Sequence, residues 1–133
     1  MIVDSSALLA VLRDEPEAAA CARALADHQP ARISAVNCVE SAAVVDGGRG
    51  PIAGRRFDEL RHEAHVAIEP VTAAQARLAR AAYRDFGRGS GHPARLNLGD
   101  CFAYALAKSS GELLSFRGGD FRHTDLELIK ATS

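Results

Sequence analysis

Acidic residues stand at several places in this sequence where they could serve either structure or chemistry, and the first is Asp4. It separates a short apolar strand, Met1 to Val3, from an apolar helix that starts near Ser6. Asp and Ser satisfy unpaired amide groups where helices begin, so capping alone could explain Asp4. The carboxyl end of a parallel strand is also a common place for a ligand site in an α/β domain. Asp4 is therefore either a helix cap or part of a ligand site, and the rest of the sequence must decide between these roles.

Glu40 is the second such acid, because it lies on the apolar side of a predicted helix over residues 35–45. Its neighbours on that helix face are Val36, Ala43 and Val44, which is the apolar stripe expected to be buried. A buried carboxylate is costly unless it is paired or binds a metal. An ion pair with an arginine and a metal site are both open explanations. The glycine-rich segment DGGRGP is expected to end this helix.

Asp100 and Asp120 also have structural explanations. Asn97 is the expected N-cap of a helix, and Asp100 then falls where an acid completes a capping box. Asp100 also shares the apolar, inward face of that helix. Asp120 follows a predicted strand through two glycines, where Asp is a common turn residue. Because Asp4 and Asp120 each follow a strand of one parallel sheet, both are expected at its carboxyl edge.

If these four acids converge, several carboxylates share one crevice. Carboxylates at such short separation raise one another's pKa unless a cation is present. A set of oxygen ligands with no obligatory His or Cys favours Mg²⁺ or Mn²⁺ over Zn²⁺. The three cysteines have no metal-site spacing and lie in apolar, helical contexts: Cys21, Cys38 and Cys101.

Composition is that of a soluble globular protein, with 133 residues, 47% hydrophobic and 25% charged. We expect one domain over residues 1–133. No apolar run approaches the roughly 20 residues of a membrane span, and no basic leader precedes an apolar stretch. These features predict a cytoplasmic protein with no membrane partner. The net charge of −1 argues against indiscriminate nucleic-acid binding.

Strand and helix patterns alternate along the chain. Strands are predicted at residues 1–3, 32–34, 66–70, 112–116 and 125–129, and helices at 6–13, 14–28, 35–45, 52–65, 72–86 and 98–110. Such alternation predicts parallel crossover units and hence a three-layer α/β/α domain with a central parallel sheet.

Arginine is unevenly distributed. The stretch from Arg77 to Arg95 has five arginines and one acid, Asp85. It could be a solvated helix face followed by a loop. The alternative is a phosphate-binding flank, because Arg suits bidentate phosphate contacts.

Four motifs follow one another over nearly the whole chain: IVDSSALLAVLRDEPEA, VESA, LNLGDCFAYALAK and GGDFRHTDLE. In content and order they resemble those of PIN-domain ribonucleases, and most closely the VapC toxins of bacterial toxin–antitoxin pairs. The stretch NLGDCFAYALA is the most specific of them.

The resemblance implies a PIN-like fold and a metal-dependent endoribonuclease that hydrolyses RNA phosphodiesters with one or two Mg²⁺ or Mn²⁺ ions. Asp4, Asp100 and Asp120 match family positions that are expected to bind metal directly. Glu40 matches a family position that either binds the metal or orients a water molecule. Ser6 takes the place of a family hydroxyl that supports the first acid. Asp125 is a further candidate acid.

The resemblance also implies partners. They are an RNA substrate, with transfer RNA as one class, a cognate VapB-type antitoxin that inhibits the enzyme, and a second copy in a homodimer. The candidates for steering the RNA backbone are Arg84, Arg88 and Arg95.

This chain departs from the family pattern in three places. Gly119 stands where close relatives often carry an acid, Ser115 interrupts an apolar strand, and VVDGGRGPIAG is a glycine-rich form of the connection between two helices. One alternative is an inactive PIN-like module that binds a partner or RNA. Another is a phosphatase of the haloacid-dehalogenase type with Asp4 as nucleophile, although that class requires a second Asp where this chain has Ser6.

Overall fold

The protein is built around a parallel sheet of five strands in the order β3-β2-β1-β4-β5. The structure is a computed structural model and describes residues 1–49, 51–117, 124–125 and 128–130. Every neighbouring pair of strands is parallel. The strands are β1 (Ile2–Val3), β2 (Ala31–Ser34), β3 (Val66–Glu69), β4 (Leu114–Phe116) and β5 (Leu128–Lys130). The last strand lies slightly later than the predicted 125–129.

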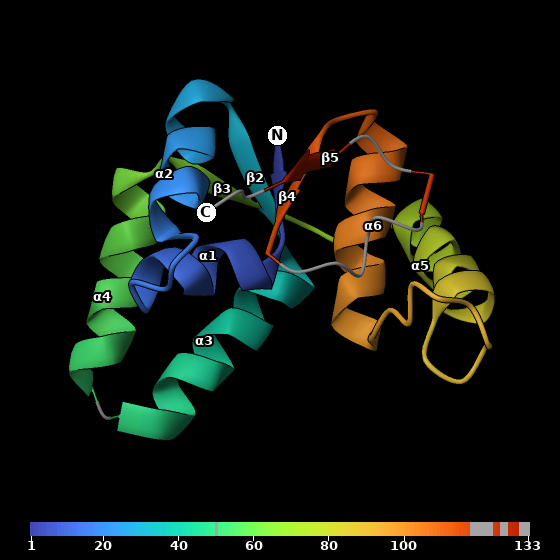
Figure 1. Cartoon of the computed structure of the whole chain (residues 1–133), viewed down its shortest axis with the longest axis horizontal. Helices are drawn as coiled ribbons and strands as arrows, with labels where there is room; N and C mark the ends of the chain where they lie inside the picture. The colour runs from blue at the N-terminus through green and yellow to red at the C-terminus, as the bar shows by residue number, and fades with distance from the viewer. Residues whose placement is uncertain (50, 118–123, 126–127, 131–133) are drawn as a thin grey trace.

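Helices cover both faces of this sheet, with α5 and α6 on one side and α1, α2, α3 and α4 on the other (Figure 1). Their bounds are α1 (Ser5–Leu12), α2 (Ala18–Asp27), α3 (Ala35–Arg49), α4 (Pro51–Glu63), α5 (Ala73–Phe86) and α6 (Leu98–Ser110). The predicted three-layer α/β/α fold with a central parallel sheet is confirmed.

A hydrophobic core lies on each face of the sheet, and the two adjacent residues of β1 belong to different cores. Ile2 packs with α5 and α6, whereas Val3 packs with the opposite helices. This follows from the alternation of side chains along a strand. Because both faces are covered, β1 is wholly buried, as is typical of a central parallel strand.

Local sequence signals account for several helix ends. Thr72 caps α5 by accepting a hydrogen bond from the Gln75 amide at 3.1 Å. Gly111 ends α6 with a left-handed φ of 67°, a conformation in which Gly carries no Cβ penalty. These ends agree with the sequence.

Helix α3 ends within DGGRGP, as predicted, but later than the predicted Val45. The helix continues through Gly47 and Gly48 as far as Arg49. Glycine lowers helix stability, but tertiary packing routinely overrides propensity. Here α4 packs closely on α3, since a Cβ on Gly54 would lie 2.7 Å from Asp46 Oδ1.

None of the helices in the described part of the chain is long and apolar enough to cross a membrane.

Candidate active site

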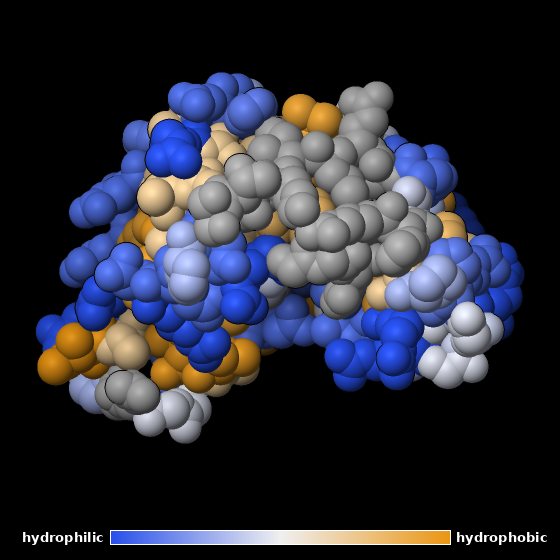
Figure 2. Space-filling view, viewed as in Figure 1, coloured by the Kyte–Doolittle hydropathy of each residue, from blue (hydrophilic) through white to orange (hydrophobic). Residues whose placement is uncertain are grey.

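Three helices begin close together at the carboxyl edge of the sheet. Helix α1 starts directly after β1, and α3 starts directly after β2. Helix α3 contacts both α1 and α6, and Figure 1 shows these helix starts below the strands. Figure 2 shows a hollow at this end, between a lobe that carries α3 and α4 and a strongly hydrophilic lobe that carries α5 and α6.

Asp4 both caps α1 and carries an unused oxygen. It is buried, with 3% of its surface exposed. Its Oδ2 accepts hydrogen bonds from the Ser6 amide and the Ser6 hydroxyl, and the Ser6 hydroxyl accepts one from the Arg117 amide at 2.9 Å. Its Oδ1 is buried and has no hydrogen-bond partner among the described residues. Capping therefore uses one oxygen and leaves the other for a ligand.

The surroundings of Asp4 disfavour its negative charge. Burial raises the pKa of the Asp4 carboxyl, the hydrogen bonds from Ser6 oppose that rise, and the nearby Glu40 carboxylate adds to it. Two carboxylates thus lie close enough to repel each other.

Glu40 is held between α1 and the start of α6. The Ser5 hydroxyl donates a hydrogen bond to Glu40 Oε1 at 2.8 Å. A Cβ on Gly99 would lie 2.7 Å from both Cδ and Oε1 of Glu40, so the carboxylate packs directly on that glycine. The ion pairs among the described residues do not include Glu40, so the structure gives no support to the arginine alternative.

The predicted apolar stripe around Glu40 is not the buried face of α3. Val44 is 44% exposed, and Ala43 is exposed as well. The buried positions are instead Asn37, Ser41 and Val45. Asn37 and Ser41 are polar, and each side chain donates a hydrogen bond there. Hydrophobic periodicity alone does not identify buried polar positions of this kind.

Asp100 lies next to Gly99 at the start of α6, and it is buried, as its predicted inward direction requires. Its Oδ2 accepts a hydrogen bond from the Asn97 amide at 2.9 Å, and Asn97 Oδ1 accepts one from the Asp100 amide at 2.7 Å. The predicted capping box is therefore present.

Asp120 lies outside the described residues. Within the part of the chain that the structure describes, no group of three or more His, Cys, Asp or Glu side chains has the spacing of a metal site. Among the described acids, Glu40 lies near enough to Asp4 to raise its pKa, and the Glu40 carboxylate packs on Gly99, the residue before Asp100.

Asp125 is engaged elsewhere on α6. Its carboxylate accepts hydrogen bonds from the Tyr104 hydroxyl at 2.7 Å and from Lys108 Nζ at 2.6 Å. Lys108 and Tyr104 hold the pKa of Asp125 below its ordinary value. These partners lie one and two turns beyond Asp100, and both Asp125 oxygens are used.

The three candidate arginines differ in their surroundings. Arg84 forms an exposed ion pair with Asp85 at 2.9 Å. Arg88 and Arg95 are exposed, and neither forms an ion pair with another described residue. Their loop is held by two 2.9 Å backbone hydrogen bonds, from Arg88 to Leu96 and from Leu96 to Phe86.

Cysteine chemistry is not supported. All three cysteines are free, and burial raises the pKa of Cys101 to about 12. A nucleophilic cysteine needs a lowered pKa instead.

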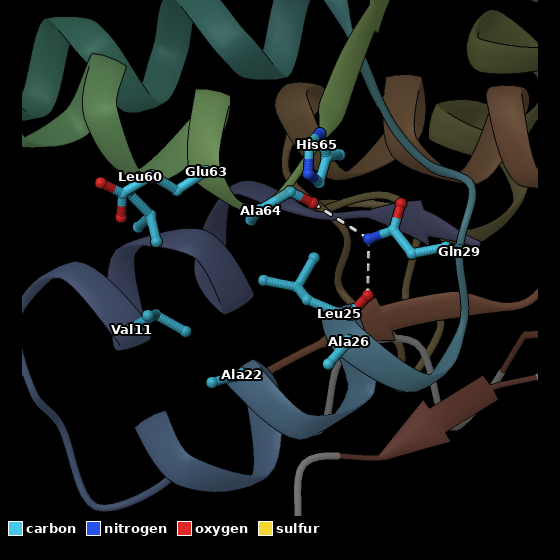
Figure 3. A pocket seen from close by; sticks show the side chains of 9 residues that line it. All are labelled: Val11, Ala22, Leu25, Ala26, Gln29, Leu60, Glu63, Ala64 and His65. Carbon is cyan, nitrogen blue, oxygen red and sulfur yellow. Dashed lines mark hydrogen bonds between the residues drawn. The ribbon is translucent and has the colours of Figure 1, made fainter.

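A cavity of about 310 Å³ lies elsewhere, among α1, α2 and α4 (Figure 3). Its lining is mostly apolar, including Val11, Leu25 and Leu60. Gln29 closes one end by donating hydrogen bonds to the Leu25 and Ala64 carbonyls. Gln29 and His65 shortly precede β2 and β3, so this end lies towards the amino edge of the sheet, opposite the acids.

Sequence reasoning missed the bond from Ser5 to Glu40, the close contact of Glu40 with Gly99, and the bond from Asn37 to Gly99. A glycine immediately before an acid in the first turn of a helix was the available signal for Gly99, because Gly is a poor helix former.

Comparison with known proteins agrees with this architecture. The PIN domain family model matches residues 1–127. Ribonuclease VapC28 of Mycobacterium tuberculosis is 56% identical over 127 residues, which cover 96% of each chain. Ribonuclease VapC42 of the same species is 49% identical over 126 residues, covering 95% of this chain and 96% of the relative.

Solved structures share the fold at lower identity. The crystal structure of M. tuberculosis VapC20, a sarcin-ricin loop cleaving toxin, superposes with a TM-score of 0.70 at 21% identity, covering 94% of this chain and 95% of that one. A toxin–antitoxin complex from Klebsiella pneumoniae gives 0.71 at 17% identity, covering 98% and 97%. From the family match and the two close relatives, this chain belongs to the PIN-domain family and, within it, to the VapC group.

Proposed function

We propose that this protein is a metal-dependent endoribonuclease toxin of the VapC type, which hydrolyses RNA phosphodiester bonds in the cytoplasm and is inhibited by a cognate antitoxin. One observation carries the metal dependence: a buried carboxylate, Asp4, has an unpartnered oxygen and a second carboxylate, Glu40, nearby. Such a pair is unfavourable without a cation. Similarity to ribonucleases VapC28 and VapC42 supports the choice of RNA.

The donor chemistry fits Mg²⁺ or Mn²⁺, since every candidate ligand is a carboxylate oxygen. In this proposal Asp4, Asp100 and Asp120 hold one or two ions directly, and Glu40 binds or orients a water. Asp4 Oδ1 is the atom best prepared for this role, because Ser6 already fixes the other oxygen.

A bound divalent ion would activate water for attack on phosphorus and would neutralise charge that builds up on the phosphate. The chain's own residues perform the positioning. Ser6 orients the Asp4 carboxylate, Ser5 orients that of Glu40, and the Asn97 cap orients that of Asp100.

The proposed partners are an RNA, for which transfer RNA is one class, a VapB-type antitoxin and a second copy of the chain. VapC relatives support the antitoxin, and a neighbour of the same fold was solved as a toxin–antitoxin complex. Arg88 and Arg95 are better candidates for RNA contact than Arg84, whose charge Asp85 already balances.

Calorimetric titration with Mn²⁺ tests the proposal on wild type and on Asp100→Asn. The amide keeps the shape and much of the capping ability of the acid while removing its charge. We expect saturable binding by wild type and a loss of affinity of at least about tenfold in the variant, because a charged ligand is removed. RNA cleavage should fall in parallel.

Asp125→Asn is the matched control, since it removes an acid that contacts the same helix outside the site. It should bind Mn²⁺ as wild type does. If wild type binds no Mn²⁺, even with RNA present, the acids are structural and the inactive-module alternative replaces the nuclease. Family membership removes the haloacid-dehalogenase alternative.

A further inference from the structure

Asn37 is a wholly buried polar residue that joins two of the helices carrying the acids. Its exposed surface is 0%. Its side-chain Nδ2 donates a hydrogen bond to the Gly99 carbonyl at 2.9 Å. This bond runs from α3 to the first turn of α6, at the residue on which the Glu40 carboxylate packs.

The backbone of Asn37 reaches the third helix. Its carbonyl accepts hydrogen bonds from the Ser5 hydroxyl at 3.1 Å and from the Ser41 hydroxyl at 2.8 Å. Ser5 is also the residue that donates to Glu40. Asn37 thus connects the starts of α1, α3 and α6, which follow or carry Asp4, Glu40 and Asp100.

Folding alone does not account for this amide. Asn37 Oδ1 is buried without a hydrogen-bond partner among the described residues. A buried, unsatisfied amide oxygen destabilises a protein, and an apolar side chain of similar shape would avoid that cost. The retained amide therefore indicates a role other than stability.

We propose that Asn37 is a positioning residue for the metal site, which sets the spacing between α3 and α6 so that Glu40 and Asp100 act on the same ion. The inference rests on the proposed function. Asn37 acts through Gly99 and Ser5 and does not itself bind the metal. Residues that orient metal ligands typically change metal affinity by about 10- to 100-fold when they are replaced.

Asn37→Leu is the test, because Leu has nearly the shape of Asn and makes no hydrogen bond. We expect a folded protein with a melting temperature close to that of wild type, because loss of the bond to Gly99 is offset by removal of the unsatisfied Oδ1. Its Kd for Mn²⁺, measured by calorimetry without RNA, should rise about tenfold. In RNA cleavage the Mn²⁺ concentration for half-maximal rate should rise equally, while the rate at saturating Mn²⁺ returns to within about threefold of wild type.

Ser41→Ala is the matched control. Ser41 is as deeply buried on the same helix and also bonds to the Asn37 carbonyl, but no hydrogen bond joins its side chain to α6 among the described residues. Its Mn²⁺ affinity should stay within about twofold of wild type, since no metal ligand depends on it. Equal losses in both variants would show a general packing effect and overturn the proposal.

If Asn37→Leu does not fold, Asn37→Ser provides the second measurement, because its shorter side chain cannot make the Asn bond to Gly99. An unchanged Mn²⁺ affinity in the folded variant would overturn the positioning role while leaving the nuclease proposal intact. Wild type that binds no Mn²⁺ would instead contradict the proposed function, and the positioning role with it.

Discussion

At the scale of single residues, the absence of a side chain at Gly99 is as informative as the acids themselves. The Glu40 carboxylate occupies the space that a Cβ would fill. Gly99 has no left-handed φ to explain it, and it lies in the first turn of α6, where Ala would be the better helix former. Close approach of Glu40 is therefore the reason for glycine here.

Gly99→Ala should displace the Glu40 carboxylate. We expect Mn²⁺ affinity to fall by about tenfold or more and the free energy of unfolding to fall by about 1–3 kcal/mol, as is usual for overpacking. Calorimetry and urea denaturation measure the two effects.

Gly48→Ala is the control for the change of residue type, because a Cβ there meets nothing within 4 Å. It should raise the free energy of unfolding by about 0.5–1 kcal/mol through helix propensity, with Mn²⁺ binding unchanged. Gly99→Ala with the same gain and normal binding would contradict the steric account.

The positions of Asp4 and Asp100 and their local supports, Ser6 and Asn97, could be predicted from sequence, but the contacts of Glu40 could not. Asp4 and Asp100 stand next to strand and helix boundaries, which are visible in sequence. Ser5 and Asn37 act across 35 and 62 residues of chain. Such contacts depend on how the helices pack, and no local pattern encodes them.

At the scale of elements, α6 is fixed at both ends and along the side that carries Tyr104 and Lys108. Asn97 and Gly111 define its ends, and Asp125 joins it through Tyr104 and Lys108. Asp125 belongs to the short described segment before β5. The contact therefore ties the last strand connection to the helix that carries Asp100.

Asp125→Asn should lower stability in a pH-dependent way. Because Lys108 and Tyr104 lower the pKa of Asp125 in the folded protein, its contribution is present above the ordinary Asp pKa of about 3.9. It is lost as the pH falls through the lower, folded value. The side chain is half exposed, so we expect only about 0.5–1 kcal/mol at pH 7.

Urea unfolding at pH 7 and near pH 3 measures this difference, and a double-mutant cycle with Lys108→Met isolates the ion pair. A stability loss in Asp125→Asn that is the same at both pH values would show that the charge contributes nothing.

Helix α3 shows where hydrophobic periodicity fails for an element. The sequence placed its buried face on Val36 and Val44 and its end before Gly47. The structure buries Asn37 and Ser41 instead and extends the helix to Arg49. Hydrogen bonds to neighbouring helices and packing against α4 decide both features, and neither is a property of the segment itself.

At the scale of the whole molecule, the fold class could be predicted and the strand order could not. Alternating strands and helices indicate a parallel sheet flanked by helices. The central place of β1 depends on its pairing with β4, which joins Ile2 to Leu114. That pairing carries Asp4 to the middle of the carboxyl edge of the sheet. Figure 2 shows a hollow between the two lobes at this end of the molecule.

The last prediction concerns RNA binding by the positive charges of one lobe beside that hollow. The lobe of α5, α6 and the loop between them is strongly hydrophilic in Figure 2, and it carries Arg88 and Arg95 as exposed cations without an acidic partner among the described residues. Each phosphate contact to a single strand contributes about −0.7 to the slope of log affinity against log salt. Replacing both arginines by Ala should therefore weaken RNA binding and reduce the slope by about 1.4, measured with Asp100→Asn protein so that RNA is not cleaved.

Arg84→Ala in the same background is the matched control, because Asp85 already balances that charge. It should change the slope by less than half as much as the double variant. An unchanged slope in the double variant would mean that RNA does not contact this lobe. A slope change as large for Arg84 would mean that RNA senses the overall field of the lobe and makes no defined phosphate contacts at the loop. The expected difference between the two variants therefore distinguishes defined phosphate contacts at Arg88 and Arg95 from a general electrostatic attraction to the lobe.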